Sequence, residues 1–383
     1  MNLEVEIERI LPGGMGLAHA DGKTVFVSLA APGDRVRVRV EREQGNVLFA
    51  SIEEILAPSP LRIEPPCPYF GRCGGCDFQQ MNYEAQLNAK ADIVKDCFHR
   101  LAGFDVTELE VVASPNQWHY RSRATWQLDS HEQSIGYYER GSRRVCDVVE
   151  CAVLVPELQT TLEQVRSSNA PKDLKHLDAV VGIEGTSLSP SFNGFQTNEL
   201  TLNIANEEYT FNAEAFFQVN HSVVTRLLEF ALADIRGEVA LDLYCGVGLF
   251  TLPLSRRFSR VIGVESNPNA TRFARRNLQN SGLDNALIQT AMLSEWFSSK
   301  TNTREAIDFI LLDPPRAGAE SIVIKGIVDL KPSRICYVSC DPATLARDIK
   351  KLIAGGYRLD SIRAFDMFPQ THHVETVVHL NEI

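Results

Sequence analysis

Hydrophobic and polar residues alternate along the first part of the chain. Four segments show this period of two, at residues 5–10, 24–27, 35–40 and 47–52. Turn-forming stretches rich in glycine, proline and aspartate separate them, so the pattern predicts short strands and a small β-barrel domain over residues 1–57. Arg35, Arg37 and Arg39 would share one face of it, either as a solvated surface or as a phosphate-contacting face.

The middle of the chain, residues 58–210, mixes helical and strand patterns. Residues 82–101 predict a helix, because Asn82 suits an N-cap and an apolar stripe follows at helical spacing. That stripe consists of Leu87, Ile93, Val94, Cys97, Phe98 and Leu101. Residues 118–141 interleave arginine with aromatic side chains, which is typical of single-stranded RNA recognition but also of an ordinary antiparallel sheet.

From residue 211 onward, apolar runs alternate with amphipathic helical segments. This alternation is typical of a doubly wound α/β domain, which we assign to residues 211–383. The apolar runs deliver polar residues at their ends, namely Asp242, Glu265, Asp313 and Cys340, with Glu375 at the start of the last run. Because the carboxyl ends of parallel strands meet at one edge of a sheet, we expect these side chains to line one crevice.

Composition and charge narrow the class of protein. The chain has 383 residues, of which 44% are hydrophobic and 23% charged, as in a globular protein of two or three domains. No run of eighteen apolar residues predicts a membrane span, and the acidic N-terminus is unlike a signal peptide, so we expect a cytoplasmic protein. The net charge of −11 argues against broad, non-specific binding to nucleic acid but allows a local basic face.

Three of the nine cysteines, Cys67, Cys73 and Cys76, lie within ten residues. An odd total does not describe a simple disulfide framework, and clustered thiols in a reducing cytoplasm are more often ligands or nucleophiles. A fourth ligand would complete a four-cysteine site, and Cys146 and Cys151 are both candidates. Zinc and a four-iron cluster both suit four cysteines, and the spacing does not separate them.

A glycine turn that follows the strand carrying Asp242 indicates the cofactor. Gly246 and Gly248 would admit an adenosine close to the backbone, and Glu265 would accept hydrogen bonds from its ribose hydroxyls. The third glycine of the dinucleotide fingerprint is missing, so an adenosyl group without phosphates fits better. We therefore predict S-adenosylmethionine as the cofactor of a methyltransferase.

A cysteine beside a methyl donor indicates methylation of carbon 5 of a pyrimidine. That carbon is a weak nucleophile until a thiolate adds to carbon 6, and a base must later remove the proton on carbon 5. Cys340 is the predicted nucleophile and Glu375 the predicted base. Asp313 would orient the edge of the pyrimidine, and Arg316 would stabilise the developing negative charge.

The motifs together resemble those of the bacterial RNA uracil-5 methyltransferases, especially the ribosomal-RNA branch with an N-terminal TRAM domain. They run in the family order through nearly the whole chain: Cys67, Cys73 and Cys76 with Cys151, Phe217-Gln218, the turn from Asp242 to Gly248, Glu265, Asp313-Pro-Pro-Arg, Ser339-Cys-Asp-Pro and His373-Val-Glu375.

The resemblance implies a class I, Rossmann-like methyltransferase domain, a TRAM-like barrel, and methylation of one uridine in 23S ribosomal RNA through a covalent cysteine–uracil adduct. It implies a [4Fe-4S] cluster in the central domain, with Cys151 as the fourth ligand, and it supports Cys340 and Glu375 as the catalytic residues. It also implies contacts to S-adenosylmethionine from Gln218, Tyr244, Glu265 and Asp313. We expect the helix at 82–101 to pack on the catalytic domain, and a monomer that binds RNA but neither DNA nor membranes.

Two residues depart from the family pattern. Leu249 stands where many relatives have asparagine, so one cofactor contact is expected to be absent. Asp341 stands where asparagine is common, and its negative charge beside Cys340 should raise the pKa of that thiol.

Three alternatives remain. The same chemistry could act on the thymine-loop uridine of tRNA, although bacterial enzymes of that branch typically lack both the barrel and the cysteine cluster. An amino-group methyltransferase is suggested by Asp313-Pro-Pro, but that chemistry gives Cys340 no role. A non-catalytic RNA-binding module built from the barrel and the cluster domain would bind RNA regardless of S-adenosylmethionine.

Overall fold

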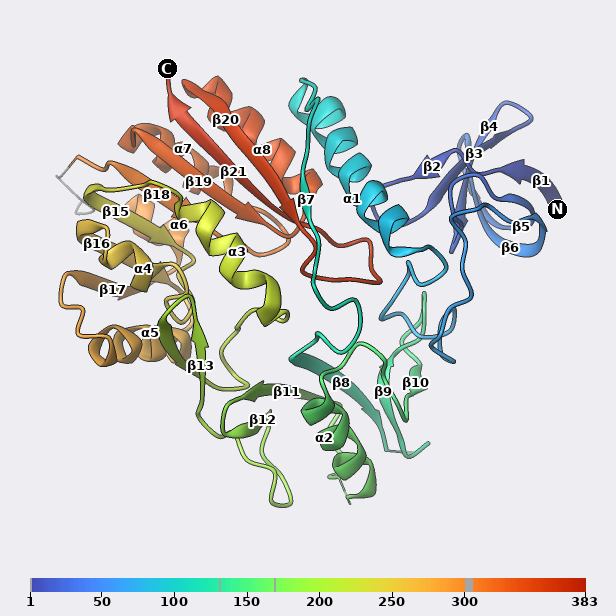
Figure 1. Ribbon diagram of the computed structural model, residues 1–383, viewed down its shortest axis with the longest axis horizontal. Coiled ribbons are helices and arrows are strands. Elements are labelled where there is room, and N and C mark those ends of the chain that lie inside the picture. The colour runs from blue at the N-terminus through green and yellow to red at the C-terminus, as the bar shows by residue number, and fades with distance from the viewer. Residues whose placement is uncertain (1, 131, 169, 300–305) are drawn as a thin grey trace.

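The structure is a computed structural model that describes residues 2–130, 132–168, 170–299 and 306–383. In this part of the chain, three sheets and one hairpin follow each other in sequence, and helices cover both faces of the last and largest sheet (Figure 1). None of the described helices combines the length and the apolar character that spanning a bilayer requires.

A six-stranded sheet forms the N-terminal part, in the order β1-β5-β6-β4-β3-β2. Its strands are β1 (Asn2–Glu6), β2 (Arg9–Ile10), β3 (Gly16–Ala20), β4 (Lys23–Ser28), β5 (Arg35–Gln44) and β6 (Val47–Ala57). Val36 and Val38 are fully buried, as the alternation predicts. The prediction of one strand over 5–10 is wrong, because the ladder between β1 and β5 ends at Glu6. The backbone of Ile7 bonds to Gly33 and Asp34 instead. Strand β3 was not predicted.

The arginine face of β5 is partly neutralised by carboxylates. Arg37 forms ion pairs with Glu4, at 2.8 Å, and with Glu54, and Arg39 lies 3.9 Å from Glu41. Guanidinium groups that share their charge with exposed carboxylates are weaker phosphate contacts. Of the two interpretations of this face, the structure therefore favours the solvated surface.

A five-stranded antiparallel sheet follows, in the order β10-β9-β8-β11-β12. Its strands are β8 (Arg123–Asp129), β9 (Ser134–Tyr138), β10 (Val145–Asp147), β11 (His176–Gly182) and β12 (Gly185–Ser189). Helix α2 (Pro156–Ser167) packs on it around the fully buried Trp126. The hairpin of β13 (Leu200–Ile204) and β14 (Glu207–Phe211) then leads to the last sheet.

The last sheet has eight strands in the order β17-β16-β15-β18-β19-β21-β20-β7. They are β15 (Gly237–Leu243), β16 (Phe258–Glu265), β17 (Ala286–Thr290), β18 (Phe309–Leu312), β19 (Arg334–Ser339), β20 (Tyr357–Phe365), β21 (Glu375–Glu382) and the short β7 (Val111–Val112). The strands from β17 to β19 are parallel, whereas β21 runs antiparallel to both neighbours. The strand order reverses between β15 and β18, and doubly wound sheets bind ligands at the carboxyl ends of strands at such a point.

Helices cover both faces of this sheet with separate hydrophobic cores. On one face lie α3 (His221–Leu232), α4 (Thr251–Ser255) and α5 (Pro268–Asn280). On the other lie α6 (Leu293–Ser298), α7 (Ser321–Leu330) and α8 (Pro342–Ala354). This is the doubly wound α/β arrangement that the sequence predicts.

A helix from the first third of the chain joins the second face. Helix α1 (Tyr83–Cys97) begins after Asn82, whose side chain accepts the Ala85 N–H at 2.9 Å, and it continues as the π-helical turn η1 (Phe98–Ala102). Its apolar residues share a core with α8. In Figure 1, α1 lies between the N-terminal sheet and the last sheet.

The buried face of α1 differs from the predicted stripe at both ends. Leu101 is 42% exposed, whereas the polar side chains of Gln86 and Lys90 are almost completely buried. A periodicity of apolar residues could not reveal this, because the partners of these two side chains lie far away in the sequence.

Candidate functional site

The predicted strand-end residues do meet at one edge of the last sheet. Asp313 follows β18, Cys340 follows β19, and Glu375 opens β21. Register brings the last two together, because Ser339 pairs with Thr376 across the antiparallel β19–β21 ladder. The Asp313 N–H donates to the carbonyl oxygen of Leu243 at 3.3 Å, which joins this group to the end of β15.

The electrostatics of this group favour protonated forms. Burial and then the charges of Glu375 and Asp313 raise the pKa of the Cys340 thiol to about 12, while Arg316 opposes them. Burial also raises the pKa of Asp313 to about 7. The pKa of Glu375 lies well above its usual value because of burial and then Asp313. Three acidic groups thus share one desolvated place with a single nearby cation.

Arg316 is held by a histidine on the neighbouring loop. Its Nη2 donates to His373 Nε2 at 3.3 Å, so this ring nitrogen is the acceptor of a neutral imidazole. Burial and then the nearby His372 and Arg316 lower the pKa of His373 to about 3, which keeps the ring neutral.

Asp341 has a structural role that the sequence analysis missed. Its side chain accepts the Thr344 N–H at 2.8 Å and so caps helix α8. The predicted effect on the neighbouring thiol has the expected direction, since the Asp341 charge raises the pKa of Cys340 after burial and the other nearby charges. The signal for the cap was present in the sequence, as an aspartate directly before a proline at a helix start.

The glycine turn after β15 is open on the side where a cofactor would lie. Gly246 has φ +54°, and a Cβ built on it would meet no atom within 4 Å. Glu265 holds the turn, because its carboxylate accepts the Gly246 N–H at 3.2 Å and the Asn267 N–H at 2.7 Å. Asp242 is fully buried, and its Oδ1 has no hydrogen-bond partner among the described residues. An open turn beside an unpaired buried oxygen suits an adenosyl ligand with polar groups.

The other predicted cofactor residues come from two segments of the chain. Tyr244 directly follows β15 and has φ +63°. Gln218 is buried in the segment before α3, where the ring of the preceding Phe217 stacks on Phe211 with centroids 4.7 Å apart. Leu249 is buried in the core of the first face, and its carbonyl oxygen accepts the Tyr209 hydroxyl at 3.0 Å.

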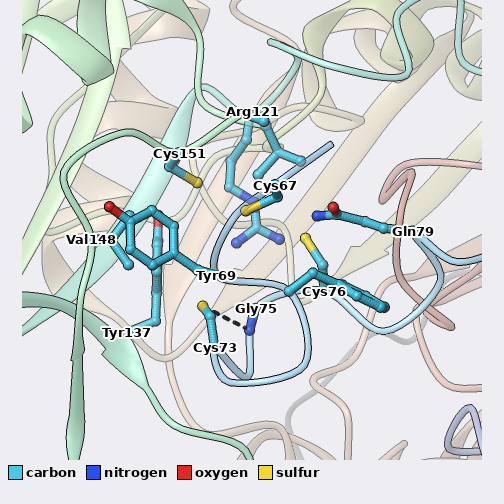
Figure 2. A pocket seen from close by; sticks show the side chains of 13 residues that line it. Cys67, Tyr69, Cys73, Gly75, Cys76, Gln79, Arg121, Tyr137, Val148 and Cys151 are labelled. Atoms are coloured by element: carbon cyan, nitrogen blue, oxygen red, sulfur yellow. Dashed lines mark hydrogen bonds between the residues drawn. The ribbon is translucent and has the colours of Figure 1, made fainter. Parts of the chain in front are cut away.

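A second cavity lies in the central region, and all four predicted cysteine ligands line it. They are Cys67, Cys73, Cys76 and Cys151 (Figure 2). Burial raises the pKa of Cys73 to about 11 and that of Cys76 to about 12. Cys146, the other candidate for the fourth ligand, is fully buried on β10 and does not line the cavity.

Two further residues at this cavity were not predicted to lie there. Arg121 and Tyr137 line it, and the Nε of Arg121 and the hydroxyl of Tyr137 are buried without a hydrogen-bond partner among the described residues (Figure 2). Both belong to the segment that we interpreted as a possible RNA-contacting face. Arg123 is also turned inward, and its guanidinium donates to the carbonyl oxygens of Ala213 and Ala215.

The four cysteines share one cavity without being arranged as ligands of a metal ion. Within the described ranges, no three His, Cys, Asp or Glu side chains are placed to hold one.

Comparison with known proteins finds matches for two regions of the chain and for nearly its whole length. A family model described as tRNA (Uracil-5-)-methyltransferase matches residues 192–383, and a TRAM domain model matches residues 2–52. The chain is 32% identical to "23S rRNA (uracil(1939)-C(5))-methyltransferase RlmD" of Pectobacterium atrosepticum, over 98% of this chain and 93% of that protein. The Pseudomonas putida protein of the same name is 34% identical, over 97% and 92% of the two chains.

A solved structure is similar over nearly the whole chain. The tRNA (uracil-54, C5)-methyltransferase of Pyrococcus abyssi, in complex with S-adenosyl-L-homocysteine, superposes with a TM-score of 0.74 at 27% identity. The match covers 98% of this chain and 100% of that one.

The two roles of Asp341 can be separated by substitution. Asp341→Asn keeps an oxygen for the Thr344 N–H but removes the charge that raises the pKa of Cys340. We expect iodoacetamide to alkylate Cys340 about threefold faster near neutral pH in this variant, because more of the thiol is ionised. Arg316→Ala should slow the reaction, since it removes the charge that lowers this pKa. Mass spectrometry of the Cys340 peptide measures both rates, and an unchanged rate in Asp341→Asn would contradict the assignment.

Proposed function

The chain belongs to the family of RNA uracil-5-methyltransferases, and we propose that it methylates carbon 5 of a uridine in 23S ribosomal RNA. The observation that carries the proposal is the placement of Cys340 and Glu375 on adjacent strands, one residue beyond a register pair, with Asp313 and Arg316 beside them. A thiol and a carboxyl that face one reaction centre are the two groups that this chemistry requires.

The reaction divides between the two groups. The Cys340 thiolate bonds to carbon 6 of the uracil, and the electrons of the 5,6 double bond move to the carbonyl oxygen O4 as an enolate. S-adenosylmethionine would supply the methyl group that carbon 5 then takes, with S-adenosylhomocysteine as the leaving group. The Glu375 carboxylate removes the remaining proton from carbon 5, the double bond reforms, and the thiolate leaves. Arg316 stabilises the enolate charge, and Asp313 orients the pyrimidine edge.

The resting site holds protons that must leave before this chemistry starts. Burial and then the charges of Glu375 and Asp313 raise the pKa of Cys340, and burial and then Asp313 raise the pKa of Glu375. A positively charged group bound beside Asp313 would lower both pKa values. Activation of the thiol should therefore depend on occupancy of the cofactor turn, which protects the nucleophile while the site is empty.

The choice of ribosomal RNA rests on the whole length of the chain. The TRAM match at residues 2–52 and the near full-length similarity to two proteins named for 23S rRNA support it. The structural relative named for tRNA supports the same chemistry on a different RNA, so tRNA is the second candidate. The division into residues 1–57, 58–210 and 211–383 and the roles of Gln218, Tyr244, Glu265 and Asp313 in binding S-adenosylmethionine stay predictions.

We further infer that Cys67, Cys73, Cys76 and Cys151 hold a [4Fe-4S] cluster. Four cysteines that line one cavity suit a cluster, in which each cysteine binds a different iron. The unpaired Nε of Arg121 also supports an anionic occupant, because a buried N–H without a partner is costly. The cluster would tie the segment of Cys67, Cys73 and Cys76 to the segment of Cys151.

Transfer of labelled methyl to unmodified total bacterial RNA tests the substrate. We expect label to appear as 5-methyluridine in the large ribosomal RNA after fractionation by size and digestion to nucleosides. Label in the tRNA fraction would keep the mechanism and replace the substrate. No label in any fraction, with an active control enzyme alongside, would contradict the proposed activity and favour a binding module.

The two catalytic residues should fail at different steps. Cys340→Ala should abolish methyl transfer and the covalent adduct with RNA containing 5-fluorouridine. Glu375→Gln should form the adduct but release product at least ~100-fold more slowly, because the proton on carbon 5 lacks its acceptor. Denaturing gels measure the adduct, and labelled methyl measures turnover. Normal release in Glu375→Gln would show that another group is the base.

The cysteine site offers a matched pair of variants. Protein purified without oxygen should be brown, with about four irons per chain. Cys151→Ser should lose most of this iron, whereas Cys146→Ser should keep it, because Cys146 does not line the cavity. Iron and zinc analysis measures the content. A colourless protein with one zinc per chain would exclude the cluster.

A further inference from the structure

The loop that leads into the proposed base has no regular structure of its own. Residues 366–374 connect β20 to β21 without a helix or strand, and Glu375 follows directly. Most of the loop is nonetheless buried, with Asp366 0%, Gln370 2% and Thr371 3% exposed. Because a buried loop must satisfy its polar groups, its conformation depends on the partners that supply those hydrogen bonds.

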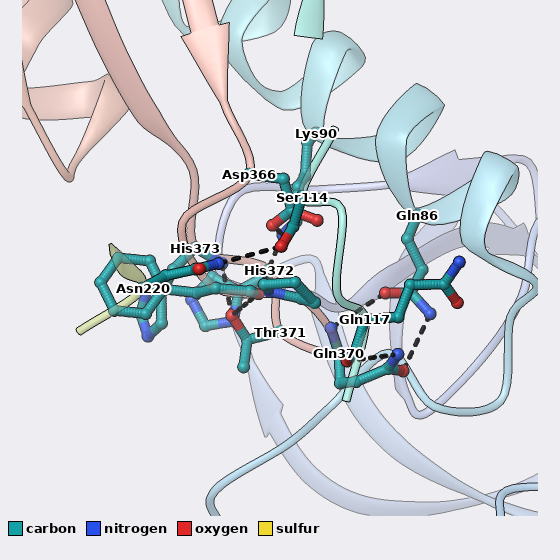
Figure 3. Close-up of polar contacts among 12 residues, drawn as sticks. Gln86, Lys90, Ser114, Gln117, Asn220, Asp366, Gln370, Thr371, His372 and His373 are labelled. Atoms are coloured by element: carbon teal, nitrogen blue, oxygen red, sulfur yellow. Dashed lines mark hydrogen bonds and ion pairs between the residues drawn. The ribbon is translucent and has the colours of Figure 1, made fainter. Parts of the chain in front are cut away.

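Most of these partners come from residues 77–120, which are far from the loop in the sequence. Both backbone polar groups of Gln370 are hydrogen-bonded. The N–H donates to Gln86 Oε1 at 3.0 Å, and the carbonyl oxygen accepts the N–H groups of Asp77 and Phe78 at 3.0 Å each. The Gln86 amide also donates to the side-chain oxygen of Gln370 at 3.0 Å (Figure 3). Gln370 itself has φ +69°, so the turn is centred on a residue held in a left-handed conformation.

Asp77 makes the contact nearest to the base. Its carboxylate accepts the His372 N–H at 2.8 Å and the His372 Nδ1–H at 2.5 Å. The turn before β3 packs on this pair, since a Cβ on Gly14 would lie 3.2 Å from both Asp77 Oδ2 and His372 Cβ. The Asp77–His372 pair therefore lies where three parts of the chain meet. These are the N-terminal sheet, the segment of Cys67, Cys73 and Cys76, and the loop of residues 366–374.

The two residues of this contact lie close in sequence to the cysteine cavity and to the proposed base. Asp77 directly follows Cys76, which lines the cysteine cavity, and His372 lies three residues before Glu375 and next to His373, the partner of Arg316. We propose that Asp77 is a positioning residue that couples the cysteine site to the catalytic base through the backbone of residues 370–375. The inference rests on the proposed function, because it takes Cys76 as a cluster ligand and Glu375 as the base.

The coupling predicts a defined failure when the link is cut. In Asp77→Ala, the thiol step should be retained, because Cys340 follows β19 and does not belong to the loop. Removal of the carbon 5 proton should slow, because Glu375 loses its fixed position. Loss of the cluster should have the same effect on the loop, and it should act through Asp77.

Hydrogen–deuterium exchange of the full chain tests the link without relying on activity. We expect amides of residues 366–374 to exchange about tenfold faster in Asp77→Ala, as the loss of a charge-assisted hydrogen bond implies, and Asp77→Asn to restore part of the protection. Asp105→Ala is the matched control, because it removes the carboxylate of an exposed His99–Asp105 pair at 2.7 Å. Peptides from β18 and β19 should be unchanged in every variant, which excludes general unfolding.

A double-variant cycle tests the connection to the cysteines. Cys76→Ser alone should accelerate exchange in residues 366–374, and combining it with Asp77→Ala should add nothing further. Additive effects of the two substitutions, or exchange in Asp77→Ala equal to that of Asp105→Ala, would overturn the proposal.

Kinetics provide the second readout. Asp77→Ala should form the adduct with 5-fluorouridine RNA at the wild-type rate but turn over ordinary RNA at least ~10-fold more slowly, with part of the activity restored in Asp77→Asn. Equal loss of adduct formation and turnover would overturn the positioning role. Should wild-type protein methylate no RNA at all, the proposed function would fail, and the exchange cycle would still decide the coupling.

Discussion

One buried ion pair joins the two ends of the chain, and the geometry of the candidate site depends on it. The Lys90 ammonium, fully buried on α1, bonds to Asp366 at the end of β20, to the Phe368 carbonyl oxygen at 3.0 Å, and shares Asp366 with the Tyr83 hydroxyl. Two charges withdrawn from water are costly unless every remaining donor and acceptor is satisfied, and removal of one partner typically costs about 3–5 kcal/mol. The Lys90–Asp366 pair therefore favours this position of α1 against the last sheet.

Burial also governs the chemistry at the strand ends. The same withdrawal from water that fixes α1 raises the pKa values of Cys340, Asp313 and Glu375, which favours their protonated forms in the free protein. The proposed nucleophile is consequently less open to alkylation and oxidation until ligands change the local charge. A site built on burial combines low reactivity at rest with strong electrostatic interactions once it is filled.

The sequence predicted the parts of this site that follow from local rules. Strand ends such as Asp313 could be placed because apolar runs stop there, and parallel strands bring such ends together. The links between distant segments could not be predicted, since nothing near Asp77 or Gln86 indicates a partner some 284 to 295 residues away. Spacing alone left both Cys146 and Cys151 open, because which thiol lines the cavity depends on tertiary structure, and only the family resemblance implied Cys151. Arg121 lines the cysteine cavity, and the local sequence pattern could not indicate this for the same reason.

The wiring of α1 and the catalytic loop also sets a time order for synthesis. Lys90 leaves the ribosome long before Asp366, which lies 276 positions later in the chain. Until the last strands emerge, helix α1 has neither its charge partner nor the core that it shares with α8, and contacts between such distant residues form late in folding. The proposed base can take its place only when translation is almost complete, so unfinished chains would hold a glycine turn able to receive the methyl donor but no finished site in which to use it.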